Sequence, residues 1–101
     1  MSSNEIIDLL SGKRVHITLS DISMHKKLGS KGRIAIDPIS TSEPLKVGDI
    51  VAIAYERKIK LRNVAIIRGD SCQLVNDFNA IEGWFMHKAL IGIVRPEGAE
   101  P

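Results

Sequence analysis

The chain has 101 residues, of which 44% are hydrophobic and 26% are charged, a composition typical of one globular domain and unlike that of a disordered segment. Its apolar runs, such as residues 64–67, are far shorter than the roughly 20 residues that span a bilayer. The single cysteine, Cys72, excludes an internal disulfide, and the three histidines lack the spacing of a zinc site. We therefore expect a soluble, cytoplasmic, single-domain protein with no membrane contact, no metal and no other cofactor.

The net charge of +2 hides an uneven distribution of charge along the chain. Residues 1–69 carry 12 Lys or Arg and 7 Asp or Glu, whereas residues 70–101 carry 2 and 5. A basic segment can mark an anionic partner. However, Phe78, Trp84 and Phe85 lie outside the basic part, whereas proteins that bind single-stranded nucleic acid interleave aromatic and basic residues. Nucleic-acid binding is therefore kept only as an alternative.

The N-terminal residues predict a short helix, and the remainder predicts strands. Ser2 and Glu5 have the spacing of a capping box, residues 6–10 supply an apolar stripe, and Gly12 ends the helix. From Arg14 onward, short apolar or alternating runs separated by turn residues are typical of a β-rich domain. The predicted strands cover residues 15–19, 33–36, 50–55, 58–64, 72–75 and 89–94.

These elements predict one mostly β domain over residues 13–96, preceded by the helical segment 1–12 and followed by a tail over 97–101. Trp84 and Phe85 are expected either in the core or in an apolar patch that binds a partner. The apolar residues expected to build the core are Ile17, Leu19, Ile34, Ile36, Ile50, Ile53, Leu61, Ile66, Leu74, Ile91 and Ile93.

Several short motifs follow one another in an order that suggests a known family. Ser23-Met24 precedes Gly32 and an apolar run, Gly48-Asp49 leads into the run 50–54, and the stretches 74–79 and 90–94 follow. Together these segments resemble the catalytic domain of the LexA and UmuD family of self-cleaving serine-lysine proteins and, more distantly, the signal peptidases. The resemblance covers most of the chain. It implies a LexA C-terminal-domain-like, signal-peptidase-like β-ribbon fold.

The resemblance also implies where a catalytic dyad would lie. Ser23 matches the nucleophile, and the count from Gly48 to the family's lysine base ends on Arg62. A base must be neutral to accept the serine proton, but the guanidinium of arginine stays protonated. We therefore interpret Ser23 as a vestigial nucleophile and Arg62 as a non-functional base position. Lys60, on the same face of its strand as Arg62, is the alternative base.

Three functions follow from these observations. The leading interpretation is a non-catalytic LexA/UmuD-like domain that acts through protein–protein association. By resemblance it would form a homodimer and would have a repressor or a damage-tolerance polymerase of a bacterial or phage regulatory system as its partner. The alternative is an active serine peptidase that uses Ser23 and Lys60. The second alternative is a basic β module that binds nucleic acid.

Overall fold

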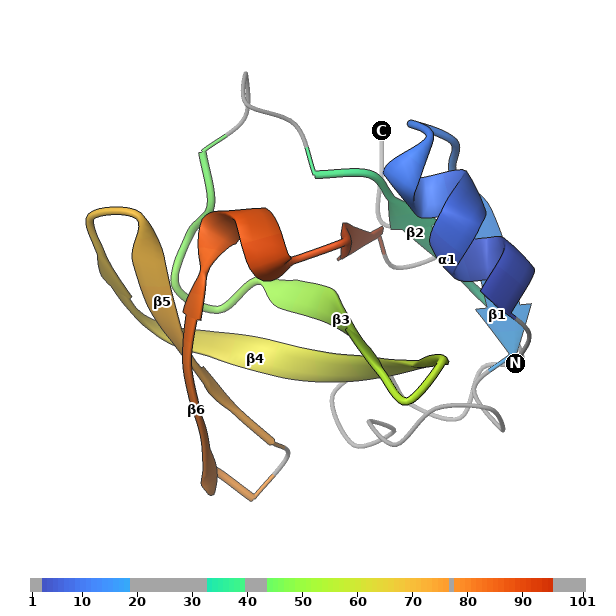
Figure 1. Ribbon diagram of the computed structural model, residues 1–101. Coiled ribbons are helices and arrows are strands. Elements are labelled where there is room, and N and C mark those ends of the chain that lie inside the picture. Colours follow the sequence, from blue (N-terminus) through green and yellow to red (C-terminus); the bar gives the residue numbers. More distant parts are fainter. Residues whose placement is uncertain (1–2, 19–32, 40–43, 77, 96–101) are drawn as a thin grey trace.

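The computed structural model describes residues 3–18, 33–39, 44–76 and 78–95 (Figure 1). They form a mostly β structure with one short N-terminal helix, which confirms the predicted class of fold. The elements in chain order are α1 (Ser3–Leu10), β1 (Val15–Thr18), β2 (Arg33–Asp37), β3 (Ile50–Tyr55), β4 (Lys58–Arg68), β5 (Ser71–Val75), β6 (Ile81–Met86), the 3-10 turn η2 (His87–Ala89) and β7 (Gly92–Arg95).

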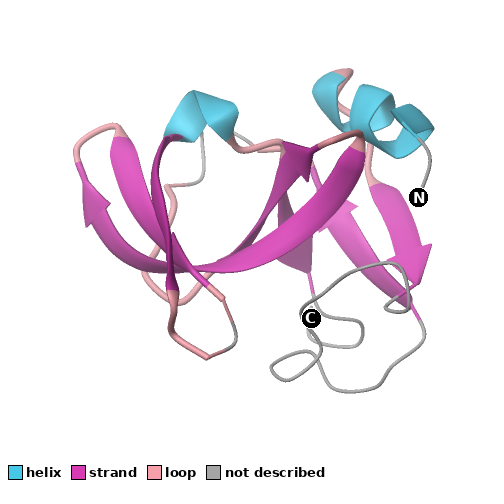
Figure 2. Ribbon diagram, turned by 60° about the horizontal axis from the view of Figure 1, so that its bottom comes forward, coloured by secondary structure: helices cyan, strands magenta, loops and turns pink. Residues whose placement is uncertain are grey.

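The described strands form one antiparallel sheet in the order β1-β2-β7-β3-β4-β5-β6. The last strand of the chain, β7, thus pairs with β2 on one side and β3 on the other. Figure 2 shows the resulting bent sheet, in which β1 and β2 occupy one end and β5 and β6 the other. Strand β6 ends the order, so it has a strand neighbour on one side only among the described residues.

Two apolar clusters pack on opposite faces of the sheet. Alternate residues of a strand point to opposite faces. Accordingly, Ile50 and Ala52 of β3 belong to the first cluster, and Val51 and Ile53 belong to the second. The first cluster also contains Leu9, Val15, Ile17, Ile34, Ile36, Ile59, Leu61, Ile91 and Val94. The second also contains Val64, Cys72, Leu74 and Leu90.

Helix α1 packs close to the sheet at Gly92, the first residue of β7. A Cβ atom at Gly92 would lie 2.5 Å from Cγ2 of Ile36, 2.9 Å from the carbonyl oxygen of Asp37 and 3.3 Å from Cδ2 of Leu9. Because α1 contributes Leu9 to the first cluster, the missing side chain at Gly92 allows the helix to approach the strand pair β2–β7. The close approach explains the glycine at this position, because its backbone dihedral angles are not unusual.

A β-bulge in β4 corrects one of the predicted core residues. The register between β4 and β5 shifts between Val64 and Ile66, so Ile66 no longer shares the face of Val64. Ile67 takes the inward position and packs against the second cluster, while Ile66 is 39% exposed. The prediction that Ile66 belongs to the core was therefore wrong. Ile93 is only half-buried, and Leu19 lies outside the described residues.

The C-terminal part of the fold contains a strand that the sequence pattern did not predict. Strand β6 pairs with β5 directly after the loop that follows Val75. Because residues 87–89 form the turn η2, the final strand begins at Gly92 and not at Ala89 as expected. The predicted turns between strands are confirmed, with positive φ angles of 98° at Gly48, 67° at Arg57 and 60° at Gly69.

Candidate functional site

The two candidate base residues lie on one face of β4, next to β3. Arg62 is paired with Val51 and Lys60 with Ile53 across the β3–β4 ladder. Since Val51 and Ile53 belong to the second cluster, both basic residues are on that face of the sheet. Arg62 is only 8% exposed, and Lys60 is half-buried. Ser23, the predicted nucleophile, lies outside the described residues.

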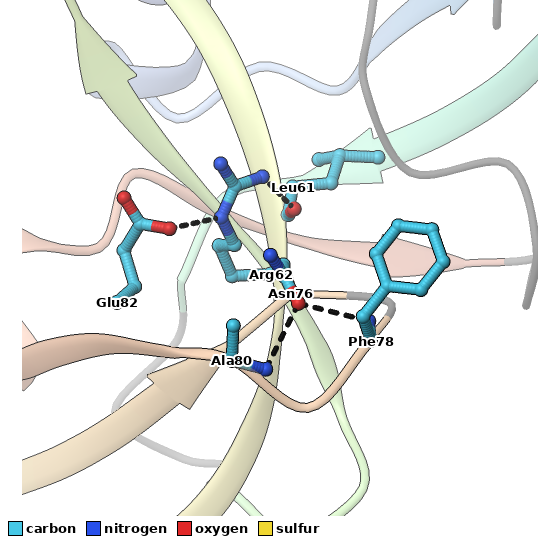
Figure 3. Close-up of polar contacts among 6 residues, drawn as sticks. All are labelled: Leu61, Arg62, Asn76, Phe78, Ala80 and Glu82. Atoms are coloured by element: carbon cyan, nitrogen blue, oxygen red, sulfur yellow. Dashed lines mark hydrogen bonds and ion pairs between the residues drawn. The ribbon is translucent and has the colours of Figure 1, made fainter.

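The guanidinium of Arg62 donates hydrogen bonds to Glu82 and to Leu61 (Figure 3). Its Nε donates to Oε1 of Glu82 at 2.8 Å, forming an ion pair. Its Nη1 donates to the backbone carbonyl of Leu61 at 2.7 Å. A buried guanidinium needs acceptors for its N–H groups, because a desolvated charge without partners is strongly destabilising. These bonds supply such partners to Arg62.

A second bulge, in β6, brings Glu82 to the arginine. Leu74 of β5 is paired with Gly83, and Val75 with Ile81, which leaves Glu82 as the extra residue of the bulged strand. An extra residue breaks the regular alternation of side chains. Glu82 thus reaches a residue of β4, although β5 separates the two strands in the sheet.

Arg62 changes the acidity of Glu82. The hydrogen bond from Arg62 lowers the pKa of the Glu82 carboxyl, and the positive charges of Arg62 and Lys60 lower it further, against the opposing effect of burial. A carboxyl whose pKa is lowered on folding stabilises the protein above its unfolded pKa. The pair therefore stabilises the fold at neutral pH, and this contribution is lost as the pH falls through the lowered pKa.

The loop between β5 and β6 is held by Asn76. Its side-chain Oδ1 accepts hydrogen bonds from the backbone N–H groups of Phe78 at 2.8 Å and Ala80 at 3.0 Å (Figure 3). Its backbone N–H donates to the carbonyl of Ala80 at 3.0 Å. Because Ala80 precedes β6 directly, these bonds fix the start of the strand that carries Glu82.

Lys60 has an aromatic neighbour. Its Nζ lies 4.0 Å from the centre of the Tyr55 ring, a residue of the same β3–β4 hairpin. The face of an aromatic ring attracts a cation electrostatically. The Lys60 side chain thus ends against an aromatic ring, and its charge also acts on the Glu82 carboxyl.

Apolar side chains are exposed on the sheet around β6. Cross-strand pairing puts Ile66, Gln73 and Trp84 in one row and Arg68, Ser71 and Met86 in the next, on the same face. Ile66, Trp84 and Met86, called here the outer-face cluster, are 39%, 46% and 49% exposed. The guanidinium carbon of Arg68 lies 5.3 Å from the centre of the Trp84 ring. Of the two predicted places for Trp84, the exposed patch is the one observed.

Other chemistry-bearing groups give no further site within the described part of the chain. Cys72 is a free, buried cysteine of the second cluster, and burial raises the pKa of its thiol. Among the described residues, no group of three or more His, Cys, Asp or Glu side chains is arranged to hold a metal ion. None of the described helices is long and apolar enough to cross a membrane.

Comparisons with protein-family models, with curated proteins and with solved structures found no match for this chain. The LexA/UmuD resemblance therefore stays a prediction from the sequence motifs. Glu82, the partner of Arg62, was missed from the sequence because it lies 20 residues further along the chain. Gly83, which follows it, is the one local signal, since an isolated glycine within a strand often marks a bulge.

Proposed function

We propose that this chain is a non-catalytic domain of the LexA/UmuD type that acts through protein–protein association. In this proposal it forms a homodimer, and its partner is a repressor or a polymerase of a bacterial or phage regulatory system. The observation that carries the proposal is the ion pair between the buried Arg62 and the partly exposed Glu82, at the position where the resemblance puts the family's lysine base.

The chemistry of the pair argues against catalysis at Arg62. A serine nucleophile needs a neutral group that accepts its proton. The guanidinium stays protonated at every physiological pH, and the Glu82 carboxylate and the Leu61 carbonyl are both acceptors that favour a positively charged donor. Arg62 could donate a hydrogen bond to a neighbouring hydroxyl but could not activate it.

The contacts of Lys60 bear on the alternative, an active peptidase that uses Ser23 and Lys60. A lysine base works as a neutral amine in a dry, positively charged or apolar environment. Lys60 instead lies 4.0 Å from a tyrosine ring, which attracts a cation, and its charge interacts with the Glu82 carboxylate. These surroundings support the non-catalytic proposal.

The outer-face cluster supports association. Small monomeric domains seldom expose neighbouring large apolar side chains unless the surface binds a partner. Trp84, Met86 and Ile66 are such neighbours, and tryptophan is among the residues most enriched at the centres of protein interfaces. The proposal therefore assigns the function to the exposed apolar surface and not to the dyad position.

A serine-directed acylating probe tests the proposal. We expect the wild-type protein to remain unlabelled from neutral pH to about pH 10, near the ordinary lysine pKa of about 10.4, because Arg62 stays charged throughout this range. Intact-mass measurement gives the labelled fraction, and Ser23→Ala sets the background.

Two further variants separate the models. Labelling of the wild type that rises with pH and disappears in Lys60→Ala would establish the peptidase alternative instead. Arg62→Lys supplies a group that can lose its proton. If the pocket is dry enough to lower the pKa of the new amine, this variant should become reactive at Ser23.

A further inference from the structure

We infer that strand β6 is the homodimer surface and that it pairs antiparallel with β6 of a second copy of this chain. This inference rests on the proposed function, because it names the partner and the surface of the proposed association. Antiparallel pairing of one strand with its own copy is the arrangement that a twofold axis produces, and it would extend the sheet across both copies.

The first argument is that the edge of β6 lacks most of the features that usually prevent pairing with another chain. Exposed edge strands in native proteins are usually protected by lysine, proline, inward-pointing charges or a bulge, and the bulge of β6 lies at Glu82, before the regular stretch 83–86. Residues 81–86 contain no lysine, arginine or proline, and their one charged residue, Glu82, is engaged by Arg62. The apolar side chains of the strand are largely exposed instead, with Ile81 at 65% and Met86 at 49%.

The second argument is the direction of the backbone groups. The N–H of His87 donates to the carbonyl of Asp70 at 2.8 Å, so the main chain of His87 faces β5. Backbone groups of successive strand residues face alternate sides. The N–H and C=O groups of Met86 and Trp84 therefore face away from β5, toward the edge at which a second strand would add.

The third argument is that one register satisfies both copies at once. With the twofold axis at Phe85, Trp84 of each copy lies opposite Met86 of the other. Both residues face the edge, so each pair exchanges main-chain hydrogen bonds. The pairing also places a methionine sulfur beside an indole ring, a favourable contact.

A second copy fits this edge better than an unrelated strand because the edge is self-complementary. In the register centred on Phe85, Trp84 and Met86 of one copy meet Met86 and Trp84 of the other, so both edges find their main-chain and side-chain partners in the same short strand. An unrelated strand would need a matching apolar pair at the same spacing.

Met86→Pro is the variant that tests the surface. The φ angle of Met86 is −72°, within the range of proline, and its N–H faces away from β5. Proline should thus leave the fold intact while removing an edge donor and the Met–Trp contact in each copy. Sedimentation analysis over a concentration series should show a wild-type dimer and a Met86→Pro dissociation constant raised roughly tenfold or more.

Ile7→Lys is the matched control, because Ile7 is likewise an exposed apolar residue, at 56%, but belongs to α1, which contributes Leu9 to the first cluster at the β1–β2 end of the sheet (Figure 2). We expect its dimer to persist. A dimer that survives Met86→Pro, or that is lost in Ile7→Lys alone, would overturn the β6 surface but leave the proposed association intact. A wild type that stays monomeric at every concentration would show that a second copy does not bind this edge and would overturn the inference. The acylation test of the non-catalytic site does not depend on that outcome.

Amide hydrogen exchange gives a second readout that needs no variant. The N–H groups of Trp84 and Met86 should exchange markedly more slowly at protein concentrations that favour the dimer, whereas the N–H of His87, already bonded to Asp70, should change little. Exchange at Trp84 and Met86 that is independent of concentration in a dimeric sample would overturn the inference.

Discussion

The Gly92→Ala variant is expected to lose about 2–4 kcal/mol of unfolding free energy, a large share of the roughly 5–15 kcal/mol of a typical domain. The added Cβ would lie 2.5 Å from a carbon of Ile36 and 2.9 Å from the backbone oxygen of Asp37. A flexible side chain can move away, but the carbonyl belongs to β2, which is paired with β7. The added Cβ would also lie 3.3 Å from Cδ2 of Leu9, so helix α1 limits movement of the strand on that side.

Denaturant unfolding of Gly92→Ala and Gly69→Ala measures this effect against a matched control. Gly69 has a φ of 60°, and a Cβ there meets no atom within 4 Å. Its substitution costs only the backbone strain of a left-handed residue, about 1 kcal/mol. Equal losses in the two variants would show that Ile36, Asp37 and Leu9 do not enclose Gly92 closely.

Leu74→Ala is expected to cost about 3–4 kcal/mol, the range for a leucine whose removal leaves a cavity in a packed core. Leu74 is fully buried in the second cluster, between β4 and β6. By contrast, Ile66→Ala should cost about 1 kcal/mol or less, because the bulge has turned Ile66 to the exposed face.

The comparison of Leu74 and Ile66 tests the bulge as well as the core. Both residues belong to the same strand pair and carry side chains of similar size, so composition alone predicts similar losses. Thermal or denaturant unfolding of the two alanine variants gives the difference. A loss at Ile66 as large as that at Leu74 would mean that β4 continues without the register shift.

Periodicity and turn residues predicted much of this fold. The helix, the strands from residue 15 to residue 75 and the turns at Gly48, Arg57 and Gly69 follow from local patterns of apolar and turn-forming residues. Such patterns depend on the near neighbours of each residue. For that reason they predicted the alternation in β3 and in the first half of β4, where the ladder is regular.

Local patterns could not predict the two bulges or what depends on them. One bulge reverses the faces of Ile66 and Ile67, and the other turns Glu82 toward Arg62. Each is set by pairing between strands that are distant in sequence. Strand β6 was missed for a related reason, because its exposed apolar residues and its glycine do not alternate as those of a half-buried strand do.

The spacing of the motifs predicted Arg62 as the residue at the base position but not its environment. An arginine on an alternating strand is most often solvated, and nothing near Arg62 in the sequence indicates that it is buried and ion-paired. The partner comes from β6, and its loop is held by Asn76. Burial of Arg62 and its pairing with Glu82 are thus consequences of the sheet order.

Titration of the Glu82 carboxyl by NMR tests most directly whether a charged, ion-paired arginine occupies the predicted base position. The hydrogen bond and charge of Arg62 should hold the pKa of Glu82 below its ordinary value of 4.5. In Arg62→Met, which keeps an apolar side chain of similar length, the pKa of Glu82 should return toward that value or rise above it. A Glu82 that titrates at its ordinary pKa in the wild type and is unchanged in Arg62→Met would contradict the ion pair, and with it the proposal that the predicted base position is non-catalytic.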